Sequence, residues 1–203
     1  MGNRFIPNFV KRYLCMTIMV LASGLAGQAA QAARQPTAAE SAGFRQAISN
    51  IESVGGYSLA VGLLRQKLAL GALLVEDAWD DSMSGQTSYP IIGNQTITIS
   101  AQKIPNLRSR NYTGRFGAAV LFEDQTWLAS VMVHEWFHTT QSYLFVHTVR
   151  WNVEPPAWRF QVGFLKKIVQ RVQGQDVSIR DRAEGLVERA QYEVDYLAGR
   201  VHD

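Results

Sequence analysis

The sequence has little cysteine and, outside its first residues, no excess of one charge. One cysteine in 203 residues excludes a fold held together by disulfides. Three of the 20 basic residues and none of the 17 acidic residues lie in residues 1–32, which leaves 17 basic against 17 acidic side chains in the rest. A neutral remainder gives no electrostatic reason to expect a nucleic acid or an anionic membrane surface as a partner. With 47% apolar residues, the composition is that of a globular protein rather than a disordered one.

The first 32 residues have the parts of an export signal. A basic stretch precedes an apolar run at 14–26, and Ala-Gln-Ala at 30–32 provides a small-x-small cleavage pattern. The run is shorter than the roughly 20 residues that a membrane-spanning helix needs. We therefore predict cleavage after residue 32 and a mature domain of 33–203, periplasmic or secreted in a bacterial host, with no stable membrane insertion; an uncleaved anchor is the alternative. Because Cys15 lies in the signal, a metal site in the mature domain must use His, Asp or Glu.

The first part of the mature domain is predicted to be helical. Thr37 and Glu40 have the spacing of a capping box, which begins a helix at 37–53 that ends at the Gly55-Gly56 pair. The buried face of this helix is expected to contain Phe44, Ala47, Ile48 and Ile51. The strongly apolar stretch 57–79 is interpreted as a core helix rather than a membrane span, because it contains basic side chains.

The rest of the chain mixes strands and helices. Alternating apolar and polar residues predict a strand at 96–100, and a short apolar run predicts another at 118–122. Three further helices are expected at 125–145, with Asp124 as N-cap, at 155–172, where a Pro-Pro pair opens the helix, and at 178–201. The predicted fold is a single α+β domain.

Two histidines four residues apart carry the clearest chemical signal. On a helix, His134 and His138 stand on the same face, where two imidazoles can bind one Zn²⁺ ion. Glu135 lies beside the first histidine and can act as general base towards a water activated by the metal. This HExxH pattern contains two of the four histidines of the chain. It predicts a zinc site.

The segment VMVHEWFHTTQ at 131–141 resembles the active-site helix of the zincin metallopeptidases. It departs from their usual pattern at Thr140, where zincins more often have an apolar residue. The resemblance implies a zincin-like domain, in which a small mixed sheet accompanies an active-site helix carrying HExxH, with Zn²⁺ as cofactor and a peptide or protein as substrate. Leu144 stands where the metzincin pattern requires a histidine, so the resemblance is to the gluzincins, whose third ligand is a Glu from a later helix.

Glu193 is the first candidate for this third ligand. The segment AQYEVDYLAG at 190–199 resembles the E-A-D/N-x-x-A segment that follows HExxH in several bacterial gluzincin-like families. Independently, a helical wheel places Glu193 on the flank of an apolar stripe, where a carboxylate must be paired, protonated or bound to metal. A salt bridge to Arg189 is the alternative interpretation. The same resemblance implies that Asp195 orients a ligand histidine, although the wheel places it on the polar side.

Other positions are weaker candidates. Glu154 begins EPPAWRFQVGFLKKI, which resembles the E-x-E-A-Y-x-x-Q helix of other HExxH proteins, but Pro156 occupies the inner Glu position. A first-turn charge favoured by the helix dipole is the simpler interpretation of Glu154. Gln161 aligns with a ligand Glu in a P-x-W-x-x-E-G segment, and a Gln there would imply an inactive site. His147 is either an alternative ligand or oxyanion stabiliser, or a residue near a helix end, whereas His202 lies next to the C-terminus.

The leading functional prediction is an exported zinc metallopeptidase of gluzincin type. His134, His138 and Glu193 would hold Zn²⁺, and Glu135 would deprotonate the water that attacks a peptide carbonyl. The alternative is a catalytically inactive zincin-like domain that binds a metal or a partner protein, because the Pro156 and Gln161 positions lack an acidic residue. Hydrolysis of a non-peptide amide would use the same chemistry. Nothing in the sequence indicates an oligomeric state.

Overall fold

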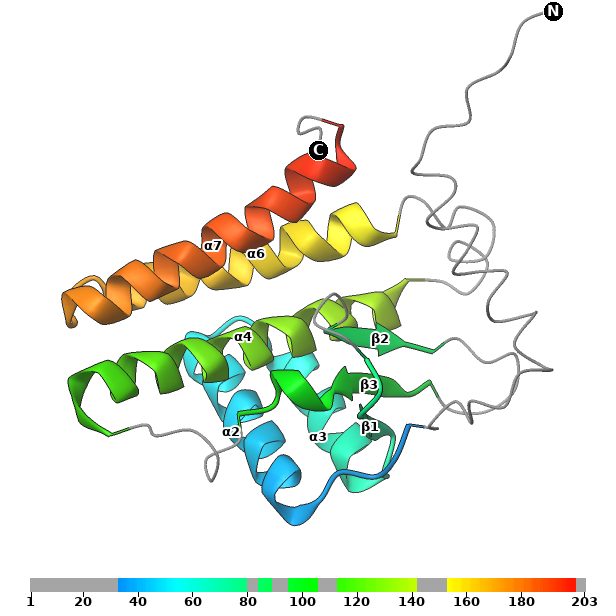
Figure 1. Ribbon diagram of the computed structural model, residues 1–203. Coiled ribbons are helices and arrows are strands. Elements are labelled where there is room, and N and C mark those ends of the chain that lie inside the picture. Colours follow the sequence, from blue (N-terminus) through cyan, green and yellow to red (C-terminus); the bar gives the residue numbers. More distant parts are fainter. Residues whose placement is uncertain (1–32, 80–83, 89–94, 106–112, 142–152, 200–203) are drawn as a thin grey trace, which may run out of the picture. The chain divides into compact units, whose positions relative to one another are not determined.

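The computed structural model describes residues 33–79, 84–88, 95–105, 113–141 and 153–199, all of which belong to one compact unit. The predicted signal at 1–32 lies outside the described residues, as do His147 and His202. In the described part, five α-helices, one 3₁₀ turn and three strands follow one another along the chain (Figure 1). The predicted α+β fold, with a small mixed sheet and the histidine pair on a helix, is confirmed.

The first helix, α2 (Ala38–Val54), forms as predicted. The Thr37 hydroxyl accepts a hydrogen bond from the Glu40 backbone N–H, and the Glu40 carboxylate accepts one from the Thr37 backbone N–H at 2.7 Å. Gly55 and Gly56 then adopt φ values of 77° and 79°, which end the helix in a conformation that other residues rarely adopt. The four apolar residues expected on the inner face are all buried.

The prediction of one helix over 57–79 is wrong in its second half. The helix α3 (Ser58–Ala69) ends before Gly71, which has a φ of 65°, and the chain continues as strand β1 (Leu73–Glu76). A continuous apolar run fits a buried helix and a buried strand equally well, so hydrophobicity alone could not separate them. The left-handed conformation of Gly71 is what divides the two elements.

The sheet has the strand order β1-β3-β2 and is mixed. The central strand β3 (Ile97–Ser100) confirms the strand predicted at 96–100; it pairs in parallel with β1 and antiparallel with β2 (Gly85–Thr87). All four residues of β3 are buried, the polar ones included, because β3 has a strand on each side. On the other side of β1, Arg34 forms an isolated bridge with Val75.

The long helix α4 (Gly114–Thr140) contains the histidine pair and corrects two predictions. The segment 118–122 is not a strand but lies inside α4, and Asp124 is not an N-cap, since the N-cap is Thr113. A short apolar run does not define its own secondary structure, and no Gly or Pro interrupts the chain between positions 118 and 140. The helix therefore begins before the apolar run and continues through it.

The last two helices, α6 (Glu154–Val172) and α7 (Val177–Leu197), form close to their predicted ranges. They pack against each other as a hairpin, and both contact α4 (Figure 1). A single apolar cluster joins α2, α3, the sheet, α4, α6 and α7, with Phe44, Leu64, Met132 and Phe164 among its fully buried members. Among the described residues, no helix combines the length and the apolar character needed to cross a membrane.

Candidate metal centre

The two histidines of α4 converge inside the protein. His134 and His138 are 6% and 5% exposed, and their Nε2 atoms lie 3.0 Å apart. One helical turn separates them, so both rings project from the same face of α4. The Trp158 ring of α6 packs edge-on against His134, with 4.8 Å between ring centroids. This contact places the histidine pair between α4 and α6.

Glu154, the first residue of α6, meets this pair. Its Oε2 lies 3.3 Å from His134 Nε2, and its Oε1 lies 3.4 Å from His138 Nε2. Later in α6, the Gln161 amide donates a hydrogen bond at 2.9 Å to Ser130 Oγ, which lies before His134 in α4, so α4 and α6 run antiparallel. The Glu154 side chain remains 47% exposed, which leaves the centre accessible to solvent on this side. Its position in the first turn of α6 also favours a negative charge.

These side chains have the chemistry and the spacing of a zinc site. His134, His138 and Glu154 are the group of described residues that could hold a metal ion. Zinc in proteins binds imidazole nitrogen and carboxylate oxygen at about 2.0–2.2 Å, so the ligand atoms of a tetrahedral ion lie roughly 3.3–3.5 Å apart. The distances of 3.0, 3.3 and 3.4 Å between the facing atoms are close to that spacing. Three protein ligands would leave the fourth position open, as in catalytic zinc sites.

Glu154 and His138 stabilise each other's charged forms. Burial lowers the pKa of His138, but the hydrogen bond and the charge of Glu154 outweigh it and raise this pKa to about 9. Burial raises the pKa of Glu154, yet its hydrogen bonds with His134 and His138 bring that pKa well below the usual range. An ionised carboxylate therefore faces a protonated imidazole. A bound metal ion would take the place of this proton, because metal ligands must be deprotonated.

Glu135 is held on the other side of the histidines by strand β2. It is 4% exposed, and the Thr87 hydroxyl lies 2.9 Å from both its backbone oxygen and its Oε2. A Cβ atom added at Gly85 would lie 2.8 Å from Glu135 Cγ and Oε1, so only glycine allows this close approach. Burial raises the pKa of Glu135, while the two histidines and Thr87 oppose the shift. Glu135 thus lies beside the ligand group without belonging to it.

The predicted ligand Glu193 is not part of this group, in which Glu154 is the carboxylate. Glu193 lies partly buried on α7, where burial raises its pKa and the charge of Arg189 opposes the shift. Arg189 itself lies over the Trp127 ring, 4.1 Å from its centroid. The Asp195 carboxylate accepts a hydrogen bond from Gln191 of the same helix at 3.3 Å. The structure therefore gives the ligand role predicted for Glu193 no support.

Gln161, the weakest of the three candidates, is 1% exposed and bonded to Ser130, outside the metal-ligand group.

The sequence did not predict the two residues that position Glu135, which are Gly85 and Thr87. They lie in a strand of only three residues, which is too short to show an alternating pattern. Their proximity to Glu135 arises from the packing of β2 on α4.

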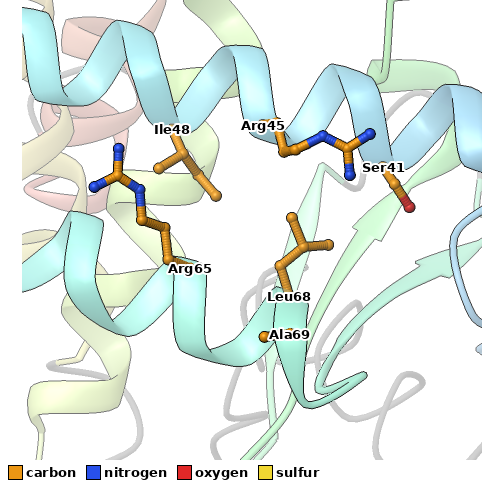
Figure 2. Close-up of a pocket in the computed structure, with 6 residues that line it drawn as sticks. All are labelled: Ser41, Arg45, Ile48, Arg65, Leu68 and Ala69. Carbon is orange, nitrogen blue, oxygen red and sulfur yellow. The ribbon is translucent and has the colours of Figure 1, made fainter.

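A separate pocket of about 510 Å³ lies between α2 and α3 (Figure 2). Ser41, Arg45 and Ile48 line it from α2, and Arg65, Leu68 and Ala69 line it from α3. Arg65 forms an ion pair with Glu52 at 2.6 Å, so its charge is already balanced. The described residues that line it include no histidine or carboxylate, and none of them belongs to the candidate metal centre.

No family model, curated protein or solved structure matches this chain.

Proposed function

We propose that this protein is an exported zinc metallopeptidase of gluzincin type, with His134, His138 and Glu154 as metal ligands and Glu135 as general base. The convergence of the two imidazoles and the Glu154 carboxylate within 3.0 to 3.4 Å is the observation that carries this proposal. The proposal replaces Glu193 by Glu154, since Glu154 is the carboxylate that faces both histidines. Export follows from the signal pattern at 1–32.

Each residue has a separate task in the proposed reaction. When bound, zinc would polarise the scissile carbonyl and lower the pKa of a coordinated water to about 7. Glu135 accepts a proton from the attacking water and delivers it to the departing amine. Burial, which raises the pKa of Glu135, makes its carboxylate a stronger base for the first of these steps.

Thr87 keeps Glu135 oriented through both steps. Its hydroxyl proton can be donated to the ionised Oε2 or to the backbone oxygen, both at 2.9 Å. When Glu135 carries the proton, the same hydroxyl oxygen can accept a hydrogen bond from the carboxylic acid while donating to the backbone oxygen. Thr87 is therefore a suitable partner for both protonation states of Glu135.

The Glu135→Gln variant tests the proposed mechanism. It should bind zinc as the wild type does and lose about 10²–10⁴-fold in the rate of hydrolysis of a quenched fluorescent peptide library, because the general base is gone. Glu188→Gln, an exposed carboxylate on α7, is the matched control and should leave the rate unchanged. Equal rates in wild type and Glu135→Gln would contradict the assigned role.

The engagement of Glu135 by β2 also favours a second candidate, a metal-binding domain without catalysis. Glu135 as a residue is 4% exposed and its carboxylate is bonded to Thr87, so it could serve the packing of β2 on α4 alone. This candidate predicts a zinc-loaded protein that cleaves no peptide of the library, whereas the metallopeptidase predicts cleavage that depends on zinc. The two outcomes separate the candidates without knowledge of the natural substrate.

A further inference from the structure

The side chain of Gln141 connects the second histidine to the beginning of α6. Gln141 is the C-cap residue of α4, three positions after His138. Its Oε1 lies 2.8 Å from His138 Nδ1, and its Nε2 donates a hydrogen bond to the backbone oxygen of Val153 at 2.9 Å. Val153 is the N-cap of α6 and directly precedes Glu154. One amide group therefore bridges His138 and the backbone of the residue that directly precedes Glu154.

The chemistry of the bridge determines which way round the amide lies. The Val153 carbonyl can only accept a hydrogen bond, so the NH₂ group of Gln141 must face it. The amide oxygen then faces His138, and since this oxygen can only accept, His138 must carry its proton on Nδ1. In the neutral ring this leaves the lone pair on Nε2, the atom that faces His134 and Glu154. Such a partner fixes both the tautomer and the orientation of a metal-binding imidazole.

The bridge also holds α4 and α6 together at the metal centre, where the sequence alone does not determine how the two helices are placed. Glu154 is 16 positions after His138. Its place in the first turn of α6 does not by itself bring its carboxylate next to α4. The bond from Gln141 to the Val153 carbonyl holds the N-terminus of α6 against the C-terminus of α4. By contrast, Nδ1 of His134 is buried and has no hydrogen-bond partner among the described residues. The support provided by Gln141 thus applies to His138 and Glu154 and not to His134.

We propose that Gln141 is a positioning residue that couples two metal ligands: it sets the tautomer of His138 and holds Glu154 at coordination distance through Val153. This role rests on the proposed zinc site, but not on peptidase activity. Replacing a partner of this kind typically lowers metal affinity about 10–100-fold. Both halves of the bridge contribute, so a variant that keeps only one half should lose less than a variant that removes both.

The test is the zinc affinity of the full-length protein, measured by competition with a chromophoric chelator. Gln141→Leu removes both hydrogen bonds and should weaken zinc binding about 10–100-fold. Gln141→Glu keeps an acceptor for His138 Nδ1 but loses the donor to Val153, so its affinity should fall between those of wild type and Gln141→Leu. Gln161→Leu is the matched control, since it removes another buried Gln from the α4–α6 contact and should leave the affinity unchanged.

Thermal unfolding of the metal-free variants separates positioning from general destabilisation. If Gln141→Leu lowers the melting temperature no more than Gln161→Leu does and still weakens zinc binding, the positioning role is supported. If Gln141→Leu binds zinc as tightly as wild type, the positioning role is overturned while the zinc site stands. If the wild type itself binds no zinc, the proposed site fails and the role of Gln141 fails with it. Should Gln141→Leu not fold, Gln141→Glu with the same affinity as wild type would overturn the proposal.

Discussion

The apolar core around α2 and the histidine pair in the contact between α4 and α6 are both buried but have opposite chemistry. Phe44 and Ile51 of α2 are fully buried among apolar side chains. In the α4–α6 contact, His134 and His138 are 6% and 5% exposed, and the Glu154 side chain that faces both remains 47% exposed. Burial of the first kind stabilises the fold, whereas burial of charged and polar groups costs free energy unless each group has a partner. The comparison shows that the polar groups of the α4–α6 contact need partners, or a bound metal ion, to offset the cost of their burial, whereas the apolar core does not.

The two regions should therefore respond differently to substitution. A change in the apolar core should lower the free energy of unfolding and leave the metal affinity of the folded protein intact. A change in the polar contact should act mainly on metal binding.

Phe44→Ala should give the largest loss of stability, about 3–5 kcal/mol in the free energy of unfolding, because it opens a cavity in a fully buried site. Phe116→Ala is the matched control, since Phe116 is 73% exposed and its loss should change stability by no more than about 0.5 kcal/mol. Urea unfolding measures both. Equal effects at the two positions would contradict the proposed core.

Glu154→Gln should lower zinc affinity by more than the ~100-fold typical of outer partners, or about 2.8 kcal/mol, because it removes a ligand. Glu193→Gln, on the neighbouring helix α7, should leave the affinity unchanged. Chelator competition on both variants decides between the two carboxylates. Loss of zinc in Glu193→Gln with retention in Glu154→Gln would restore the ligand predicted from the sequence and refute the one assigned from the structure.

Thr87→Val should cost about 1–2 kcal/mol in the free energy of unfolding, because the new side chain has a similar shape but leaves the buried Glu135 carboxylate without its hydroxyl donor. Thr87→Ser keeps the hydroxyl and should lose less. Urea unfolding of the metal-free proteins provides the measurement. A larger loss in Thr87→Ser than in Thr87→Val would show that the methyl group, and not the hydroxyl, matters at this position.

The smallest effect is expected at the ion pair that joins the chain before α2 to its first turn. A hydrogen bond from Arg34 lowers the pKa of Glu40 from 4.5 to about 2; burial opposes this shift, and Thr37 assists it. Since the folded-state pKa is depressed, the stabilisation is present above pH 4.5 and is lost as the pH falls from 4.5 to about 2. Solvent exposure keeps the contribution below about 1 kcal/mol.

Arg34→Gln should reduce this pH dependence, since only the weaker contribution of Thr37 remains at Glu40; the variant also removes the ion pair between Arg34 and Asp77. Urea midpoints at pH 7 and pH 3 for wild type and variant measure the difference between the two proteins. The same fall in both proteins would assign the acid sensitivity to other carboxylates.

Local signals in the sequence predicted local structure well. The capping residues Thr37 and Glu40 and the Gly55-Gly56 pair located α2 almost to the residue, because each acts on its own neighbours. The HExxH spacing likewise placed His134 and His138 on one helical face. In both cases the cause and the effect lie within one or two helical turns.

Features that depend on tertiary packing could not be predicted in this way. A helical wheel showed that Glu193 lies beside an apolar stripe, but not which element that stripe would meet. Glu154 was interpreted as a first-turn charge, because nothing local shows that α6 begins opposite His138. Thr87 contacts Glu135 across 48 positions of sequence, through a strand too short to recognise.

The zinc content of the protein, purified without chelator and measured by elemental mass spectrometry, tests the central claim most directly. The account predicts about one zinc ion per chain, held by the three ligands that meet between α4 and α6. A protein that contains no zinc and takes up none on reconstitution would contradict it, and the polar contact would then be a hydrogen-bonded element of the fold alone.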